Sequence, residues 1–491
     1  MYKSCSFTLL AVLFSLFGYS QKDTMRLELQ QVVRMAETGS PDAQIAETQL
    51  NNNFWRYQSF LADFKPQINF EATLPNLNRS IEAITLPDGS DIFLSRSLMR
   101  NDVGITLQQD IPLTGGRVFA STGLQRIDIF KTDGNPGSLS YLSSPISIGL
   151  IQPLLGFNQL KWDKKIEPLR YEEATRGYTE DQADIAFEGA SRFFDVLIAQ
   201  LNVEATIRDK ANADTLYEIS NSRFEVGTIA ETELLQIELN ARNAETNLAQ
   251  SRFDLQNSTE RLRNFLGIRT PTTFQLVPPY ELPEYIVDPD LALEMARKYR
   301  SQTIAFRRRR MEAERNVAQA KGETGFSADI FASFGLSQTA PTIGEAYQSP
   351  LDQEQIQIGL NFPIADWGKT QARLEIAASN AELIRMQVQQ EEINFDQEII
   401  IKVNQFQQVR QQAVLAERSY EIAQKRLNIT RKRYRIGKID VTDLNLAISE
   451  EANARRSYIS ALQNFWLAAY DLRRLTLYDF ENDRALIRTG N

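Results

Sequence analysis

The chain has 491 residues, of which 42% are apolar and 24% are charged, a composition typical of a folded protein rather than a disordered one. Its 54 basic and 63 acidic residues give a net charge of −9, which argues against nucleic acid as a partner. The absence of histidine removes the commonest general base, the commonest metal ligand and every Ser-His or Cys-His nucleophile. Carboxylate-pair or lysine chemistry remains possible, but no motif for it stands out, so we expect no enzyme and no catalytic, cofactor-binding or metal-binding residues.

Residues 1–20 have the pattern of a secretory signal peptide. Lys3 supplies a positive charge, residues 7–17 form a short apolar segment, and small residues precede a cut at Gln21. The alternative is a buried N-terminal helix, but polar chain follows the apolar segment abruptly. The only cysteine, Cys5, precedes that segment, so we expect the exported chain to lack disulfides. No other stretch approaches ~18 uninterrupted apolar residues, so a membrane span would have to consist of strands.

An internal repeat divides the rest of the chain into two halves. The segment from Arg223 to Ile229 recurs from Arg433 to Ile439, 210 residues later. The same offset holds at Thr232/Thr442, Leu234/Leu444, Asn243/Asn453, Ala244/Ala454, Leu262/Leu472 and Arg263/Arg473. Near the start of each half, weaker matches such as Met35-Ala36 with Met295-Ala296 follow an offset of 260. The first half should therefore carry about fifty extra residues, between residues 74 and 144.

The repeat predicts a domain organisation. We expect a signal peptide at 1–20, a first repeat at 21–268, a proline-rich linker at 269–289, a second repeat at 290–478 and a tail at 479–491. Within each half the expected order is helix, strands, a very long helix, a turn and another long helix.

Residues 370–436 contain neither glycine nor proline and predict one uninterrupted helix. Small or apolar residues recur in steps of three and four at Leu374, Ala377, Ala381, Ile384, Val388, Phe395, Ile399, Phe406, Val409, Ala413, Ala416, Tyr420, Ala423 and Leu427. Polar Glu391 and Lys402 occupy two further seam positions, and a four-four step at Phe395 is a stutter. At ~1.5 Å per residue this helix would be about 100 Å long, which suits a wall of packed rods.

Alternating segments predict strands with one apolar and one polar face. Ile356, Ile358, Leu360 and Phe362 share one face, and residues 68–74 and 146–150 alternate in the same way. The alternative is an ordinary sandwich with one face on a core. In a membrane, about eight strands are needed to close a barrel and an open sheet edge is not tolerated. Several copies would then share one barrel, with their long helices forming a tube beneath it.

These features together resemble the TolC-like outer-membrane efflux protein family. The resemblance covers essentially the whole exported chain, and it includes the strand-to-helix junctions at Pro153 and Pro363 and the Arg-aromatic-x-aliphatic-Gly turns. It implies an α+β membrane protein, a homotrimer with a shared transmembrane β-barrel in outer-membrane lipid and a long α-helical coiled-coil tunnel in the periplasm. It implies the outer-membrane channel of a tripartite efflux system in a Gram-negative bacterium, a passive duct served by a periplasmic adaptor (membrane fusion) protein and an inner-membrane transporter of RND or ABC type.

The resemblance also suggests site residues near the two turns. Family members narrow the periplasmic entrance there, some with acidic side chains, and Asp443 and its first-half equivalent Glu233 match such a position. Leu446 replaces the next acidic residue of some relatives, which leaves a second acidic ring in doubt. The alternative role for both carboxylates is to stabilise a helix N-terminus. The adaptor-docking turns would comprise Arg223, Phe224, Gly227, Arg433, Tyr434 and Gly437, with the glycines adopting positive φ.

Other functional classes remain open from the sequence. An exit duct of a type I protein secretion system would have the same architecture. A periplasmic coiled-coil scaffold would explain the rods but not the strands, and a secreted hydrolase is disfavoured by the missing histidine. The basic run at residues 307–310 is interpreted as a solvated helix face, because Glu312 and Glu314 lie beside it.

The extra residues of the first half contain two further alternating runs, at 102–107 and 118–124. Between them, residues 112–116 read Pro-Leu-Thr-Gly-Gly, a tight reversal. We therefore predict six strands per subunit and eighteen per trimer, against the four and twelve usual in the family. The alternatives are a long external loop and a plug inside the lumen.

Overall fold

The computed structural model describes residues 23–85, 87–131, 136–436, 438–439 and 441–487. The predicted signal peptide and Gly437 of the second turn lie outside these residues. The described chain forms two compact units, one of residues up to 50, 175–301 and 394 onward, the other of residues 51–174 and 302–393. The first unit is helical and the second contains the large sheet. Each unit holds parts of both sequence repeats, and the predicted domain boundaries stay a prediction.

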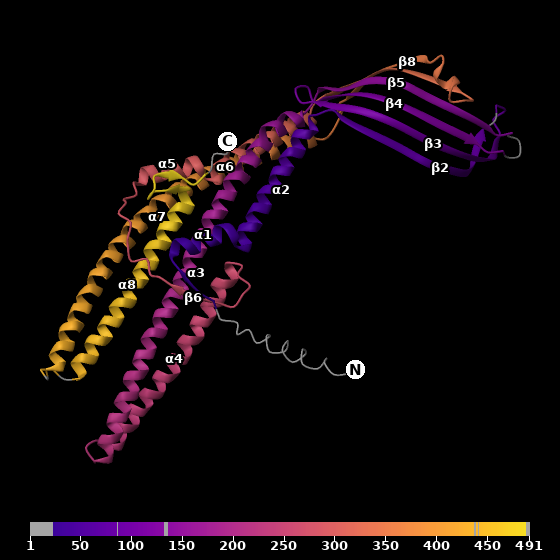
Figure 1. The fold of residues 1–491 in the computed structure, drawn as a ribbon. Coiled ribbons are helices and arrows are strands. Elements are labelled where there is room, and N and C mark those ends of the chain that lie inside the picture. The colour runs from indigo at the N-terminus through magenta and orange to yellow at the C-terminus, as the bar shows by residue number, and fades with distance from the viewer. Residues whose placement is uncertain (1–22, 86, 132–135, 437, 440, 488–491) are drawn as a thin grey trace, which may run out of the picture. The chain divides into compact units, whose positions relative to one another are not determined.

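The helices recur at both predicted offsets. Helices α3 (Gln159–Glu225) and α4 (Glu231–Phe265) correspond, 210 residues later, to α7 (Lys369–Arg435) and α8 (Val441–Thr476). Helices α1 (Leu29–Gly39) and α2 (Pro41–Asp63) correspond, 260 residues later, to α5 (Pro289–Tyr299) and α6 (Ser301–Glu323). Both registers of the repeat are confirmed. In Figure 1 the long helices form two hairpins, α3 with α4 and α7 with α8.

The predicted seam of α7 is buried against the rest of the chain. All fourteen small or apolar seam positions named above are buried or half-buried. The two polar seam positions form ion pairs, Lys402 with Asp471 of α8 at 2.9 Å and Glu391 with Arg309 of α6 at 2.6 Å. The helix therefore uses its three-four spacing for packing, as a coiled coil does.

The helical unit has one apolar core. Its largest fully buried side chains include Phe193, Phe194, Phe406 and Phe465, and burying each such ring contributes roughly 1.5–3 kcal/mol. Strand β1 (Asp23–Leu27) pairs in parallel with β6 (Thr272–Leu276) beside this core. Because β6 falls in the predicted linker, that segment is part of the folded unit. A short hairpin of β9 (Tyr478–Asp479) and β10 (Arg484–Ala485) follows α8.

The other unit contains a six-stranded sheet in the order β2-β3-β4-β5-β7-β8, with every neighbouring pair antiparallel (Figure 1). The strands are β2 (Gln67–Thr85), β3 (Asp91–Ile111), β4 (Gly116–Ile129), β5 (Ser138–Leu155), β7 (Ser327–Ala340) and β8 (Leu351–Asn361). A single 3-10 turn, η1 (Glu345–Tyr347), lies between β7 and β8, and Ser143 Oγ donates a hydrogen bond to the Ala346 carbonyl within it.

The extra residues of the first half form the hairpin β3–β4. In the second half β7 is followed directly by β8, whereas in the first half β3 and β4 stand between the corresponding β2 and β5. The turn between them contains Gly115 at φ +76°, a left-handed conformation that favours glycine. The prediction of six strands per chain is confirmed, and a loop or plug at this position is excluded.

Candidate functional site

One face of the sheet is apolar and exposed. Strand register places residues that face the same way opposite one another, for example Phe70 opposite Ile105 and Ile330 opposite Ile358. The exposed side chains of this face include Ile68, Phe70, Ile105, Leu107, Val118, Ile146, Ile148, Phe334, Ile356, Ile358 and Leu360. They come from all six strands. An exposed apolar surface of this extent marks a site of contact with lipid or another protein.

A β-bulge keeps this face continuous along β2. Apolar residues occupy even positions at Ile68 and Phe70 but odd positions at Leu77 and Ile81. The pairing of β2 with β3 shifts between Thr73 and Asn76, which adds one residue to β2. One added residue reverses which positions of a strand face each side. The bulge therefore places Leu77 and Ile81 on the same face of the sheet as Ile68 and Phe70.

The opposite face of the sheet is mainly polar. It presents side chains such as Asn69, Thr106 and Gln357, which alternate with the apolar positions. Its aromatic exceptions are Phe119 and Phe331, whose ring centroids lie 6.1 Å apart. A Cβ atom at Gly149 would lie 2.3 Å from the Phe119 ring, so this glycine makes room for the ring.

The sheet has two open edges. Among the described strands, β2 and β8 each pair with one neighbour only. Their outward backbone groups form templates for pairing with another strand. Among the described residues, no helix has the length and apolar character needed to cross a membrane.

The first helical hairpin turns through a Schellman motif. The Gly227 N–H donates to the Phe224 carbonyl at 2.8 Å, and the Thr228 N–H donates to the Arg223 carbonyl at 2.9 Å. Gly227 has φ +72°, which confirms the positive φ predicted for it. In the second hairpin the Lys438 N–H donates to the Arg433 carbonyl at 3.0 Å, the same bond 210 residues later. Gly437 and the side chain of Tyr434 lie outside the described residues.

The two candidate entrance carboxylates occupy the same position in their hairpins. Glu233 is the third residue of α4 and Asp443 the third residue of α8, and both side chains are exposed. This position supports the helix-dipole role, since an acidic group in a first turn faces the positive end of the helix. Arg223, Phe224 and Arg433, predicted as docking residues, are also exposed, near the end of the preceding helix.

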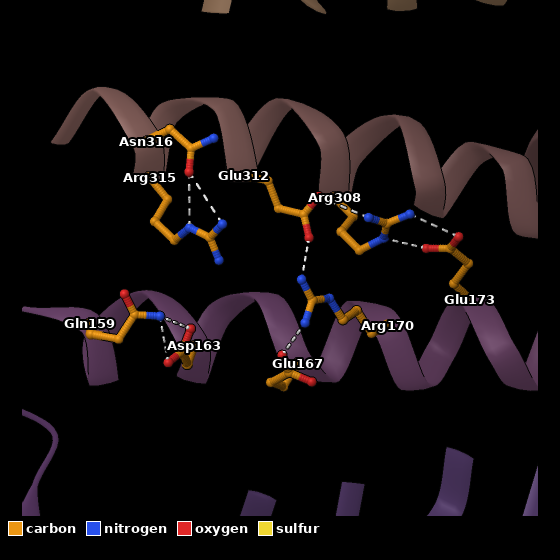
Figure 2. A network of polar contacts seen from close by, with 9 residues as sticks. All are labelled: Gln159, Asp163, Glu167, Arg170, Glu173, Arg308, Glu312, Arg315 and Asn316. Atoms are coloured by element: carbon orange, nitrogen blue, oxygen red, sulfur yellow. Dashed lines mark hydrogen bonds and ion pairs between the residues drawn. The ribbon is translucent and has the colours of Figure 1, made fainter. Parts of the chain in front are cut away.

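The basic run of α6 is not a solvated face, and that interpretation was wrong. Arg308 bonds Glu173 of α3 at 2.6 Å and Glu312 at 2.9 Å, and Arg170 bonds Glu312 and Glu167 at 2.6 Å each (Figure 2). Glu173 and Glu312 raise the pKa of the Arg308 guanidinium, although partial burial opposes them. The sequence was misleading because Glu173, the α3 partner of Arg308, lies 135 residues away in the chain, where no local spacing reports it.

On a second flank of α6, the same run contacts helix α7. Arg309 pairs with Glu391 and Arg310 with Glu392, both of α7, at 2.6 Å. Helix α6 is thus fixed by ion pairs to α3 on one flank and to α7 on the other. Only Arg307 of the run is exposed.

One pocket of the helical unit is acidic. A cavity of about 330 Å³ is lined in part by Asp42, Gln49, Asp181, Asp184 and Glu188. Burial, together with Asp184 and Glu180, raises the pKa of the Asp181 carboxyl. Within the described part of the chain, no three histidine, cysteine or acidic side chains are arranged to hold a metal ion.

Comparison with solved structures gives the same fold over nearly the whole chain. The Campylobacter jejuni CmeC outer membrane channel aligns with 93% of this chain and 87% of its own, at 15% identity and a TM-score of 0.64. The Vibrio cholerae outer membrane protein VceC aligns over 91% and 95%, at 14% identity and a TM-score of 0.59. The Neisseria gonorrhoeae MtrE outer membrane channel aligns over 94% and 91%, at 15% identity and a TM-score of 0.51. A comparison with curated proteins found no match.

The family model of outer membrane efflux proteins matches residues 32–268 and 293–476. The two matches fall on the two halves of the repeat and together span most of the chain. The family comprises outer-membrane channels and is not an enzyme family. The chain therefore belongs to the outer membrane efflux protein family, and it resides in the outer membrane of a Gram-negative bacterium.

Proposed function

We propose that the protein is the passive exit duct of a tripartite efflux system, a homotrimer whose eighteen strands form one β-barrel. The observation that carries this proposal is the sheet, with an apolar exposed face on all six strands and two open edges. Apolar-out and polar-in strands suit a barrel wall in lipid. Six strands are too few to close a barrel, so three copies supply the wall together.

The internal repeat supplies the register with which neighbouring copies join. Strands β5 and β7 connect the two halves within a chain, with Leu150 opposite Ala332. The counterpart of Leu150 is Leu360 in β8, and the counterpart of Ala332 is Ala72 in β2. We therefore place Leu360 of one copy opposite Ala72 of the next. This pairing satisfies both open edges, as a sheet in lipid requires.

The helices complete the duct below the barrel. We assign the two hairpins of each copy to a periplasmic tunnel whose turns dock onto a periplasmic adaptor. The docking residues are Arg223, Phe224, Gly227, Arg433, Tyr434 and Gly437. Glu233 and Asp443 from three copies give six carboxylates at the narrow end, where they favour cations. The exported chain performs no chemistry, and an inner-membrane transporter of RND or ABC type supplies the energy.

The barrel is tested by joining its edges covalently. In a background without Cys5, the variant Ala72→Cys/Leu360→Cys should give a covalent trimer after mild oxidation, because directly opposite residues of paired strands bring their Cβ atoms within about 5.5 Å. The control Ala72→Cys/Ile358→Cys moves one cysteine by two residues and should crosslink poorly. A folded, monodisperse monomer by light scattering would refute the proposal.

The partner class is tested separately. Crosslinking in cells followed by purification should recover an adaptor and an inner-membrane transporter with the trimer. Recovery of a transporter dedicated to one polypeptide substrate would instead support a type I secretion duct. Recovery of the protein outside the outer-membrane fraction would favour a periplasmic scaffold.

A further inference from the structure

A second pocket of the helical unit lies between the end of β1 and one face of α1. Its volume is about 370 Å³, within the range of ordinary ligand pockets. The residues that line it are Arg26, Leu27, Gln31, Arg34, Met35 and Thr38. Those of α1 are three or four residues apart, so they share one face of the helix. Leu27 is buried and Met35 is half-buried, and they give the pocket an apolar part.

The charge of this pocket is positive and unpaired. Both charged residues that line it are arginines, in contrast to the carboxylates of the acidic pocket. Arg26 and Arg34 are exposed, and neither forms an ion pair within the described part of the chain. The Glu28 N–H donates to Gln31 Oε1 at 2.9 Å, which leaves the Gln31 amide N–H groups as donors. Positive charge and N–H donors beside apolar surface suit an organic anion.

The second half of the repeat shows that the fold does not require these arginines. At the offset of 260, Arg26 corresponds to Ile286 and Arg34 to Glu294. Helix α5 nevertheless begins and ends at the positions equivalent to those of α1. Ile286 and Glu294 are both exposed. The two positive charges are therefore a property of the first half alone, and they are not explained by the packing of α1.

Strand β1, whose last residues line the pocket, has a free edge. Among the described strands it pairs only with β6. The Leu27 carbonyl accepts a hydrogen bond from the Val277 N–H at 3.0 Å, so it points toward β6. Because backbone groups of successive strand residues point to opposite edges, those of Arg26 and Thr24 point away from β6. Among the described residues they bond to nothing on that side. Such an edge is a template for an added strand.

We propose that this pocket and the free edge of β1 bind an extended acidic peptide, a segment of a partner protein. The peptide backbone pairs with Thr24 and Arg26, and its carboxylates bind the guanidinium groups of Arg26 and Arg34. Apolar side chains of the peptide contact Leu27 and Met35. Charge complementarity selects an acidic partner, and backbone pairing selects a peptide over an inorganic anion. The inference goes beyond the proposed duct, because it adds a partner site on residues other than those of the hairpin turns.

The first test is calorimetric titration of the exported protein in detergent with the peptide acetyl-Glu-Val-Glu-Val-Glu-amide. The variant Arg26→Ile/Arg34→Glu carries the residues of the second half at both positions, so it should fold. It should raise the dissociation constant by on the order of 100-fold, because two charged contacts are lost. The matched control Arg252→Ile/Arg307→Glu changes two exposed arginines outside the pocket and should bind like the wild type. No binding to the wild type, or equal affinities of the two variants, would overturn the inference.

The second test separates strand addition from simple attraction of charge. Thr24→Pro removes an N–H from the free edge and leaves the pairing with β6, as an edge strand tolerates. It should weaken peptide binding by about fivefold, the effect of one lost hydrogen bond, whereas Thr24→Ala keeps the N–H and should bind like the wild type. Inorganic phosphate, and the same peptide with glutamine in place of glutamate, should bind at least about tenfold more weakly than the acidic peptide. Equal binding of phosphate, or no effect of Thr24→Pro, would refute an acidic peptide as the occupant.

Discussion

Residues 307–310 of α6 are four arginines, whereas their counterparts in α2, residues 47–50, are Glu-Thr-Gln-Leu. The two helices have the same length and follow the same repeat. Helix α6 lies between two long helices of its own chain and forms ion pairs with both. Helix α2 carries exposed Trp55 and Leu61 instead.

Helices α2 and α6 share their length and place in the repeat but differ in the side chains on their surfaces. Both segments are helical, and each packs on the long helix of its own half, α2 on α3 and α6 on α7. The same backbone arrangement therefore forms with either a charged or an uncharged surface. The difference lies in the charged flank of α6, which forms ion pairs with α3 of the other half of the repeat. Within a chain, that neighbour is always present and charged groups can be paired on folding.

The largest expected effect, on the width of the proposed barrel, comes from removing the two extra strands of the first half. Deleting residues 88–137 removes fifty residues, the difference between the two offsets, and with them β3 and β4. The trimer should then have twelve strands, and its barrel should be about two-thirds as wide, because diameter grows roughly linearly with strand number. Electron-microscope projections along the barrel axis measure this width.

A matched deletion controls for the loss of chain. Removing residues 81–95 shortens only the turn end of the β2–β3 hairpin. The pairing of β3 with β4 begins at Leu98, outside the deleted segment. The barrel width should not change. A full-width barrel after deletion of residues 88–137 would mean that β3 and β4 do not belong to the wall of the assembled protein.

The next prediction compares the two hairpins through their carboxylates. Glu233→Gln/Asp443→Asn removes six negative charges from the proposed entrance and should reduce cation selectivity, measured as a smaller reversal potential under a salt gradient. Each single variant should give part of the effect. An unchanged reversal potential would leave both carboxylates with the helix-end role alone.

Much of this fold follows from local patterns in the sequence. Alternation predicts the strands, three-four spacing predicts the seam of α7, and the repeat predicts the matching lengths of α3 and α7. The two inserted strands follow from runs such as Val103 to Leu107 and from the glycines at 115 and 116. Each of these signals depends on residues close together in the chain or on a fixed offset.

The ion pairs of α6 and the exposure of Trp367 did not follow, for a physical reason. Arg308 meets Glu173, 135 residues away, so no local spacing reports the pair. The exposure of Trp367 has meaning only beside its counterpart Phe157, which is half-buried. The available signal was the offset of 210 applied to the junctions before the helices.

A smaller effect is expected from breaking the charged contact of α6. Arg308→Ala leaves Glu173 and Glu312 without their shared cation, and both carboxylates are less than one-third exposed. We expect a loss of about 1–2 kcal/mol, seen as a lower Tm by a few degrees in thermal unfolding. Arg307→Ala removes an exposed neighbour and should change stability by less than about 0.5 kcal/mol. Equal effects of the two variants would argue that the network contributes nothing.

The smallest effect concerns the contact between α2 and its own long helix. Arg309 bonds Glu391 in the second half, but the corresponding residues of the first half are Gln49 and Asp181. Both line the acidic pocket, and burial with neighbouring carboxylates raises the pKa of Asp181. Because the folded pKa lies above the ordinary 3.8, ionised Asp181 lowers stability at neutral pH, and this loss disappears as pH falls below that value.

Gln49→Arg should therefore supply the missing cation and raise the Tm at pH 7 by about 1–2 °C, a gain below about 1 kcal/mol for a partly exposed pair. The gain should vanish near pH 3, where Asp181 is protonated whether the chain is folded or unfolded. Gln49→Glu is the matched control, and it should lower the Tm at pH 7 because it adds a further carboxylate to the pocket. A gain that persists unchanged at pH 3 would show that the arginine acts through packing, and the electrostatic difference between the two halves would not extend to this contact.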